Sequence, residues 1–199
     1  MNTKPDPLEA ADDAQLGNLA LEFLYTVRAA RGGRVDLFQT PQDFLAWLRR
    51  HTPSASATDV QVSEARVVLD EARSLRVDIG LLVEARHRRR ILPEWALFGV
   101  NRILEGSRWS WTIAQTVDGL ALEEHPAGRG PAGLLAPVAL AAVRLLVTVP
   151  ADRLRPCASS RCGAWFVDTS KGGRRRWCSM ARCGNREKAA VHRAKVPRH

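Results

Sequence analysis

Four cysteines near the C-terminus constrain the fold of this chain more than any other feature of its sequence. They lie within 27 of the 199 residues with the spacing C-x4-C-x15-C-x4-C, at Cys157, Cys162, Cys178 and Cys183. Two local pairs joined by a longer loop are typical of a closed zinc site with four thiolate ligands. The first residues lack the apolar core of a signal peptide, so we expect a cytoplasmic chain, where disulfides are rare. The sequence therefore predicts one structural Zn²⁺ and disfavours both a disulfide framework and four unrelated cysteines.

The positive charge of the chain is concentrated around these cysteines. Residues 1–150 contain 17 Lys and Arg against 18 Asp and Glu, whereas residues 151–199 contain 13 against 3. A zinc ion with four thiolates adds a charge of only about −2, so this last segment stays strongly basic. Such an uneven distribution is typical of a protein that binds a polyanion through one part of its chain. We therefore divide the chain into a body, residues 1–150, and a basic zinc finger, residues 151–199.

The first two thirds of the body are predicted to be helical, after a lead-in at 1–15 that we expect to be disordered. Apolar residues recur every three or four positions from Leu16 to Val27, which predicts a helix that ends at Gly32–Gly33. Three further helices are expected: one capped by Thr40 with Pro41 and Asp43 behind it, one from Val62 to Val83 with apolar residues on one face, and one from about Pro93 that carries Leu97, Phe98 and Leu104. A linker at 53–58 separates the second helix from the third.

The apolar pattern changes to a period of two after residue 107. Trp109, Trp111 and Ile113 alternate with polar residues, which predicts a half-buried strand. Asp118–Gly119 is typical of a hairpin turn, so we expect a second, antiparallel strand behind it. A last helix is predicted over 131–147. Its apolar run is short and contains a proline and an arginine, which favours a buried helix over a membrane span.

The segment between the two cysteine pairs, "WFVDTSKGGRRRW" at 165–177, predicts a strand, a glycine turn and a second strand. Ser179 is expected to cap a final helix that begins at Met180, carries Cys183 and continues to Lys195. A cysteine loop, a hairpin and a helix that supplies the last ligands form a treble-clef arrangement. Zinc binding contributes an apparent ~10–16 kcal/mol in small units of this kind. We therefore expect residues 157–195 to fold only with the metal.

Residues 153–195 resemble the CGNR zinc finger. They share its four cysteines, the stretches Phe-x-Asp-Thr-Ser and Arg-Arg-Trp-Cys-Ser-Met, and the tetrapeptide CGNR at 183–186. Residues 12–150 resemble the ABATE domain that accompanies this finger in bacterial proteins, although Tyr25 stands where the family is expected to have an asparagine. The resemblance implies a transcription regulator. The predicted fold class is α+β: a mainly helical N-terminal domain with a small antiparallel sheet, followed by a treble-clef-like zinc finger.

Eight basic residues around the cysteines are predicted to contact nucleic acid. Arg182 and Arg186 are candidates to read base edges, because an arginine binds guanine through two hydrogen bonds. The remaining six are expected to contact phosphates: Arg174, Arg175, Arg176, Lys188, Arg193 and Lys195. Arg186 has a structural alternative, in which it donates to a carbonyl or to Asp168. Gly184 is expected to serve the fold by letting the helix approach the hairpin closely.

The sequence thus predicts a regulator whose finger binds double-stranded DNA and whose body mediates homodimerisation or senses a signal. An RNA- or ribosome-associated module stays open as an alternative, as does a finger that docks on an acidic protein; RNA itself stays open as a partner, and no membrane is expected. A treble-clef nuclease is disfavoured because the predicted hairpin has no histidine and four thiolates leave zinc no open position for water. We predict no catalytic residue.

Overall fold

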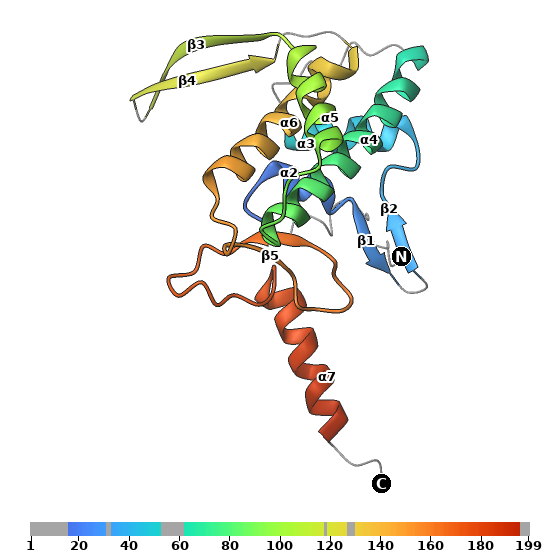
Figure 1. Cartoon of the computed structure of the whole chain (residues 1–199), viewed down its shortest axis with the longest axis vertical. Helices are drawn as coiled ribbons and strands as arrows, with labels where there is room; N and C mark the ends of the chain where they lie inside the picture. Colours follow the sequence, from blue (N-terminus) through green and yellow to red (C-terminus); the bar gives the residue numbers. More distant parts are fainter. Residues whose placement is uncertain (1–15, 31–32, 53–61, 118, 127–129, 196–199) are drawn as a thin grey trace.

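The computed structural model describes residues 16–30, 33–52, 62–117, 119–126 and 130–195. It shows an elongated molecule with a helical body, a hairpin that projects from one end, and a terminal helix that projects from the other (Figure 1). The predicted lead-in, the linker at 53–58 and Asp118 of the predicted turn lie outside the described residues.

The described part of the body begins with helix α2 (Leu19–Leu24), which is followed almost at once by strand β1 (Val27–Ala30). β1 pairs in antiparallel fashion with β2 (Gly33–Asp36). The predicted helix, which was expected to end at Gly32–Gly33, was therefore wrong beyond Leu24. The hydroxyl of Thr26 donates to the Phe23 carbonyl at 2.6 Å and closes the helix. The apolar spacing gives no sign of this stop, because the strand begins with the same kind of residue.

Helix α3 (Pro41–His51) begins as predicted. The Thr40 hydroxyl accepts from the Asp43 amide at 3.3 Å, and the Asp43 carboxylate accepts from the Thr40 amide at 2.7 Å. This reciprocal pair is the capping box that the sequence indicated. The buried face of α3 contains the predicted residues Phe44, Trp47 and Leu48.

Helices α4 (Val62–His87), α5 (Glu94–Glu105) and α6 (Gly130–Thr148) pack against one another in the centre of the body. The side chain of Val62 lies outside the described part, and the other residues of the predicted apolar face of α4 are buried: Ala65, Leu69, Ala72, Leu75, Ile79, Leu82 and Val83. On α5 the core receives Ala96, Val100 and Ile103, whereas Phe98 is exposed. Among the described helices, α6 alone is long and apolar enough to cross a membrane. It is also a core helix of the body, with eight buried residues.

Strands β3 (Trp109–Thr116) and β4 (Gly119–Pro126) form the predicted antiparallel hairpin, with Thr116 opposite Gly119. The hairpin extends away from the helices instead of packing on them (Figure 1). Consequently Ile113 is 75% exposed and Leu120 is 79% exposed. The prediction of a half-buried strand was wrong for Ile113, because alternation in a sequence indicates an apolar face but does not say what covers it.

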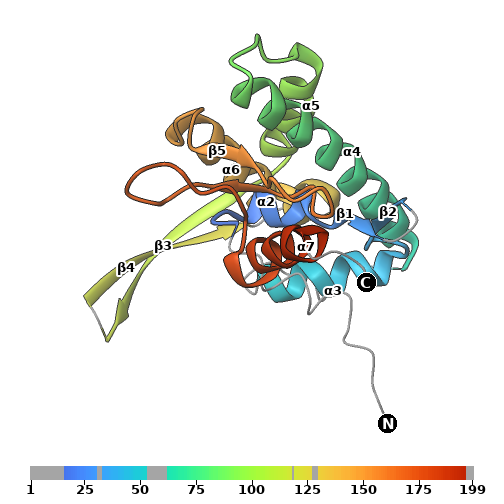
Figure 2. The ribbon, with the colours of Figure 1, turned by 90° about the horizontal axis from the view of Figure 1, so that it is seen from below.

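The finger contains strands β5 (Leu154–Pro156) and β6 (Trp165–Val167), a π-helical turn η1 (Met180–Gly184), and helix α7 (Asn185–Lys195). β6 pairs with β5. The predicted second strand at 174–177 was therefore wrong. The Arg175 amide in that segment donates to the Asp168 carboxylate at 2.9 Å, so a side chain takes the place of a strand partner. In the view from below, α7 is seen almost end-on in front of the body, because the helix points away from the body (Figure 2).

Candidate metal centre

The four cysteines converge on one point in the finger. Their sulfur atoms all lie within 4.8 Å of one another, and all four side chains are buried. The Cys162 and Cys178 sulfurs are 3.5 Å apart, and those of Cys178 and Cys183 are 3.7 Å apart. A tetrahedron of zinc–sulfur bonds of about 2.3 Å has sulfur–sulfur edges of about 3.8 Å. The spacing therefore fits one zinc ion with four thiolate ligands and no open position.

Short backbone contacts set the position of each ligand. The Cys157 amide donates to the Ala164 carbonyl at 2.7 Å, which closes the loop that also carries Cys162. The Cys178 amide donates to the Cys157 sulfur at 3.4 Å, a contact that stabilises a thiolate. Ser179 caps η1 as predicted, with its hydroxyl accepting from the Arg182 amide at 3.3 Å. The cap and the π-helical turn behind it orient Cys183 toward the other three sulfurs.

The chemistry of the donor set also requires a cation. Burial, and then the nearby Cys162 thiolate, raise the pKa of the Cys183 thiol to about 11. Four thiolates buried so close together are stable only beside a positive charge that offsets their desolvation and mutual repulsion. When bound, the zinc ion supplies that charge and holds two distant segments of the chain together, with no catalytic chemistry. The finger contains one structural Zn²⁺, as predicted.

Asp168 organises the chain between the two cysteine pairs. Its carboxylate accepts from the amide and hydroxyl of Ser170 at 3.0 and 2.6 Å, from the Arg175 amide at 2.9 Å, and lies 3.5 Å from the Arg155 guanidinium. Burial alone would raise the pKa of Asp168, but these donors lower it to about 2. A buried, ionised carboxylate thus holds the turn at 168–175 in place.

Gly184, the last residue of η1, lies against the Trp177 ring of the preceding loop. A Cβ at this position would lie 3.2 Å from the Trp177 ring and would collide with the Met180 sulfur. The expected close approach is thereby confirmed.

The arginines of the finger separate into an inward and an outward group. Inward arginines are half-buried and bind chain atoms: Arg153 on the Ser170 carbonyl, Arg155 on the Gly173 carbonyl, Arg175 on the Trp177 and Cys178 carbonyls, and Arg182 on Tyr25. The outward basic residues have exposed side chains: Arg161, Lys171, Arg174, Arg176, Arg186, Lys188 and Arg193. Lys195 ends α7, and its side chain is outside the described part. Of the eight sequence candidates, Arg175 and Arg182 therefore make hydrogen bonds within the protein, and Arg176, although exposed, lies 5.0 Å from the centroid of the Trp177 ring.

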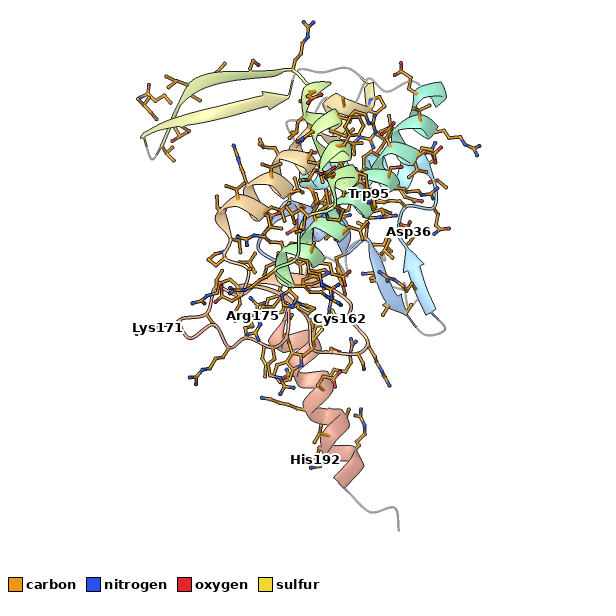
Figure 3. The ribbon with its side chains drawn as sticks, viewed as in Figure 1. Asp36, Trp95, Cys162, Lys171, Arg175 and His192 are labelled. Carbon is orange, nitrogen blue, oxygen red and sulfur yellow. The ribbon has the colours of Figure 1, made fainter. Side chains whose placement is uncertain are left out.

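Arg182 belongs to a joint between finger and body. Its guanidinium donates to the Tyr25 hydroxyl and lies 5.1 Å from the centroid of the Tyr25 ring. The Tyr25 oxygen is 3.9 Å from the Cys162 sulfur, so a residue of the body reaches a zinc ligand. Burial raises the pKa of Tyr25 above its usual value, which keeps the phenol protonated and able to donate to a thiolate. Cys162 lies at the boundary between body and finger, with Arg175 nearby and His192 far along α7 (Figure 3).

Two further contacts complete this joint. The Val167 amide donates to the Leu16 carbonyl at 3.0 Å, which ties β6 to the start of the body. The His87 ring, at the end of α4, makes an edge contact with the Trp165 ring, with the two centroids 5.1 Å apart. The same imidazole forms a 2.7 Å hydrogen bond with the Leu154 carbonyl. No pattern in the sequence indicated these contacts, since the partners are far apart along the chain.

Known families match both parts of the chain. Residues 153–196 match the CGNR zinc finger. Residues 17–149 match the ABATE family, described as "Putative stress-induced transcription regulator". No curated protein is significantly similar to the chain. Because the second match covers more than half of the sequence, the chain belongs to the ABATE family and carries a C-terminal CGNR zinc finger.

Proposed function

We propose that this protein is a DNA-binding transcription regulator in which the finger contacts duplex DNA. The observation that carries the proposal is the position of α7, which projects from the finger with no other part of the described chain beside its C-terminal half (Figure 1). Every side chain from residue 185 to residue 193 is exposed except Glu187, which is half-buried and accepts from the Ser159 hydroxyl at 2.7 Å. A free, basic helix of this kind fits a major groove.

The outward basic residues are our candidates for the contacts with DNA. Arg186 and Arg193 are seven residues apart and so share one face of α7. Within the described residues the Arg186 side chain makes no hydrogen bond to a carbonyl and no ion pair, which favours a role in reading a base over its structural alternative. Lys188 and Arg193 on α7, with Arg174 and Arg176 in the preceding loop, are suited to bind phosphates. Lys195, the last residue of α7, is a further candidate for a phosphate contact on the basis of the sequence alone.

Arg175 and Arg182 have a supporting role in this proposal. Each is half-buried and already binds oxygen atoms of the protein, so neither guanidinium is available for two hydrogen bonds to guanine. The π-helical turn also rotates Arg182 away from the α-helical face that it would otherwise share with Arg186. They hold the basic helix in position.

We also propose that the protein acts without catalysis, in the cytoplasm. Four thiolates complete the zinc coordination, and His192 lies on the exposed surface of α7, away from the cysteines. A metal-dependent nuclease needs an open coordination position for water. This arrangement therefore favours a binding module over an enzyme.

A second copy of the chain is the partner that we propose for the β3–β4 hairpin. An isolated two-stranded hairpin is marginal in water, and both of its edges can pair with another strand. Its exposed apolar residues Ile113, Val117 and Leu120 would be covered in a symmetric dimer. Ile113→Lys should convert a dimer to a monomer in light scattering, whereas Val67→Lys, on an exposed part of α4, should not. A wild-type protein that is monomeric at every concentration would contradict this proposal.

The test of DNA binding is a salt titration of fluorescence anisotropy with the zinc-loaded full chain, using short duplex DNA and, in parallel, structured RNA. We expect log affinity to fall linearly with log salt, with a slope of about −0.9 for each phosphate bound, and RNA to bind more weakly. Arg186→Ala should weaken binding about tenfold or more without loss of zinc, whereas Arg66→Ala, on the exposed face of α4, should have no effect.

Tighter binding of RNA than of DNA would support the RNA-associated alternative. If neither nucleic acid binds at low salt, the proposed DNA-binding function is wrong, and the basic face meets an acidic protein or nothing.

A further inference from the structure

A cavity of about 520 Å³ lies between the body and the finger. The body supplies two walls, one from the end of α2 and the β1–β2 hairpin, and one from α4. The finger supplies the third wall through Ser160, Gly163 and Trp165, which flank the ligand Cys162. The volume is that of an ordinary small-molecule site, and joints between domains are where such sites often lie.

The walls of the cavity combine polar and apolar surface in about equal parts. Leu24, Val27, Val77 and Leu81 line it from the body, and the half-buried indole of Trp165 lines it from the finger. These side chains could enclose a small aliphatic or aromatic group. The polar part of the lining comes from Arg34, Arg76, Glu84 and Ser160, so a ligand with one apolar and one polar end fits it.

The charged groups at the cavity favour an anion. Arg76 is compensated, since its guanidinium binds both oxygens of Asp36 and also the Thr26 hydroxyl at 2.7 Å. Glu84 is compensated by Arg88 at 2.8 Å. Arg34, on β2, is exposed and has no carboxylate within ion-pair distance in the described part of the chain. Within the part of the chain that the structure describes, a positive charge without a carboxylate partner therefore lies at this cavity.

We propose that this cavity binds a small organic acid, with its apolar part between α4 and Trp165 and its carboxylate at Arg34. The hydroxyl of Ser160 is able to donate to the second carboxylate oxygen or to another polar atom of the ligand. A neutral molecule of the same shape lacks the contact with Arg34 and binds more weakly.

The cavity is connected to the zinc centre by Tyr25 and by the loop between the first two ligands. Tyr25 lines the cavity and also contacts Arg182 and the Cys162 sulfur. Ser160 and Gly163 belong to the segment that Cys157 and Cys162 anchor. A ligand that touches the body and this segment together stabilises the joint and thereby fixes the direction of α7. This last step rests on the proposed DNA-binding function, whereas binding of the acid does not.

The test is isothermal titration of the zinc-loaded full chain with 4-phenylbutyrate, and with 4-phenylbutanol as the neutral analogue of the same length. We expect the acid to saturate one site with a Kd of about 1 mM or tighter. The alcohol should bind about tenfold more weakly. Arg34→Gln should remove this preference and leave the affinity for the alcohol unchanged.

Two variants of α4 locate the site. Val77→Glu places a negative charge in the cavity and should abolish binding of the acid. Val67→Glu is the matched control, because Val67 is 55% exposed and Val77 is 58% exposed on the same helix, and Val67 does not line the cavity. The indole N–H signal of Trp165, assigned by its loss in Trp165→Phe, should shift on addition of the acid and not change in Val77→Glu.

Absence of saturation, equal affinity for acid and alcohol, or equal effects of the two α4 substitutions would each overturn the proposal. Fluorescence anisotropy with duplex DNA, measured in separate samples, distinguishes the claim that the cavity binds an acid from the claim that the finger binds DNA. Binding of the acid to a protein that does not bind DNA supports the cavity and contradicts the proposed function. Binding of DNA by a protein that does not bind the acid supports the proposed function and contradicts the ligand site in the cavity.

Discussion

The body and the finger of this protein are stabilised by different means. The body buries a cluster of large aromatic side chains, in which Phe23, Phe38 and Trp47 lie with ring centroids 5.4–5.9 Å apart. The finger buries one aromatic ring, that of Phe166, together with its four cysteines and a few small apolar groups. Apolar burial is enough to fold a body of this size, whereas the finger needs a metal ion. The contrast shows why one chain can combine a packed domain with a projecting basic helix.

The arginines that turn inward show the same contrast. In the body, Arg76 is buried and binds the carboxylate of Asp36. In the finger, Arg153, Arg155 and Arg175 donate mainly to backbone carbonyls of loops. Where few apolar side chains are available, hydrogen bonds from arginine hold irregular backbone in place and satisfy its carbonyls.

Loss of a zinc ligand should separate the two parts most strongly. Cys183→Ser should abolish zinc binding and unfold the finger, because zinc contributes about 10–16 kcal/mol in units of this kind. The body should keep its helical circular dichroism and its aromatic cluster. Zinc content and duplex binding, measured on the same sample, should both be lost. A variant that still binds one zinc ion would contradict the assignment of this ligand.

The converse experiment weakens the body alone. Trp47 is 2% exposed, so Trp47→Ala should lower the free energy of unfolding of the body by about 3–5 kcal/mol. Zinc content should not change, because Trp47 is far from the cysteines in the chain and packs among the aromatic rings of the body. Trp95→Ala is the control: this side chain is 58% exposed, and its loss should change stability by no more than about 0.5 kcal/mol.

A weaker effect is expected within the finger. Asp168→Asn replaces the carboxylate that accepts hydrogen bonds from Ser170 and Arg175 with a neutral amide. This change should destabilise the finger by about 2–3 kcal/mol. Zinc affinity, measured by competition with a chromophoric chelator, should fall while the stability of the body does not change. Unchanged zinc affinity in Asp168→Asn would contradict the role of this carboxylate.

The pH dependence of this effect has a defined sign. The pKa of Asp168 is about 2 in the folded protein, below its ordinary value of about 3.9. Its contribution is therefore fully present above about pH 4 and is lost as the pH falls toward 2. The difference in zinc affinity between wild type and Asp168→Asn should stay constant between about pH 5 and 7. A difference that shrinks within this range would show that Asp168 titrates at a higher pH.

The mildest effect is expected at the joint between the two parts. Tyr25→Phe removes the hydroxyl that accepts from Arg182 and lies near Cys162, at a cost of about 1 kcal/mol. Hydrogen exchange should become faster in the loop at 158–164, while zinc stays bound. Trp95→Phe is the control, because it alters an exposed ring on α5, leaves the joint intact and should not change the exchange of this loop. Equal exchange in wild type and Tyr25→Phe would show that the hydroxyl does not hold the loop.

The sequence predicted those features that depend on local chemistry. The cysteine spacing indicated the zinc site, Thr40 and Ser179 indicated two helix starts, and Asp118–Gly119 indicated the hairpin turn. Each of these is determined by residues close together in the chain. The apolar face of α4 was also predicted, because a long helix repeats its period many times.

The features that the sequence did not predict depend on distant partners. The segment at 174–177 was expected to pair as a strand, but the Asp168 carboxylate binds its backbone and β5 pairs with β6 instead. Arg182 was expected to face DNA, yet it lies on Tyr25, and no local pattern connects two residues so far apart. The cavity is likewise formed by three separate segments. Such contacts follow from how the body and the finger pack on each other.

The contrast between a body that folds by apolar burial and a finger that folds by metal binding is best tested by hydrogen exchange. The full chain would be followed by mass spectrometry with zinc and after chelation. We predict that protection is lost between residues 157 and 195 on chelation and is kept in α4 and α6. Protection of the finger that survives without zinc would contradict the role of the metal. So would a loss of protection that extends through the helices of the body, since the body and the finger would then fold as one unit.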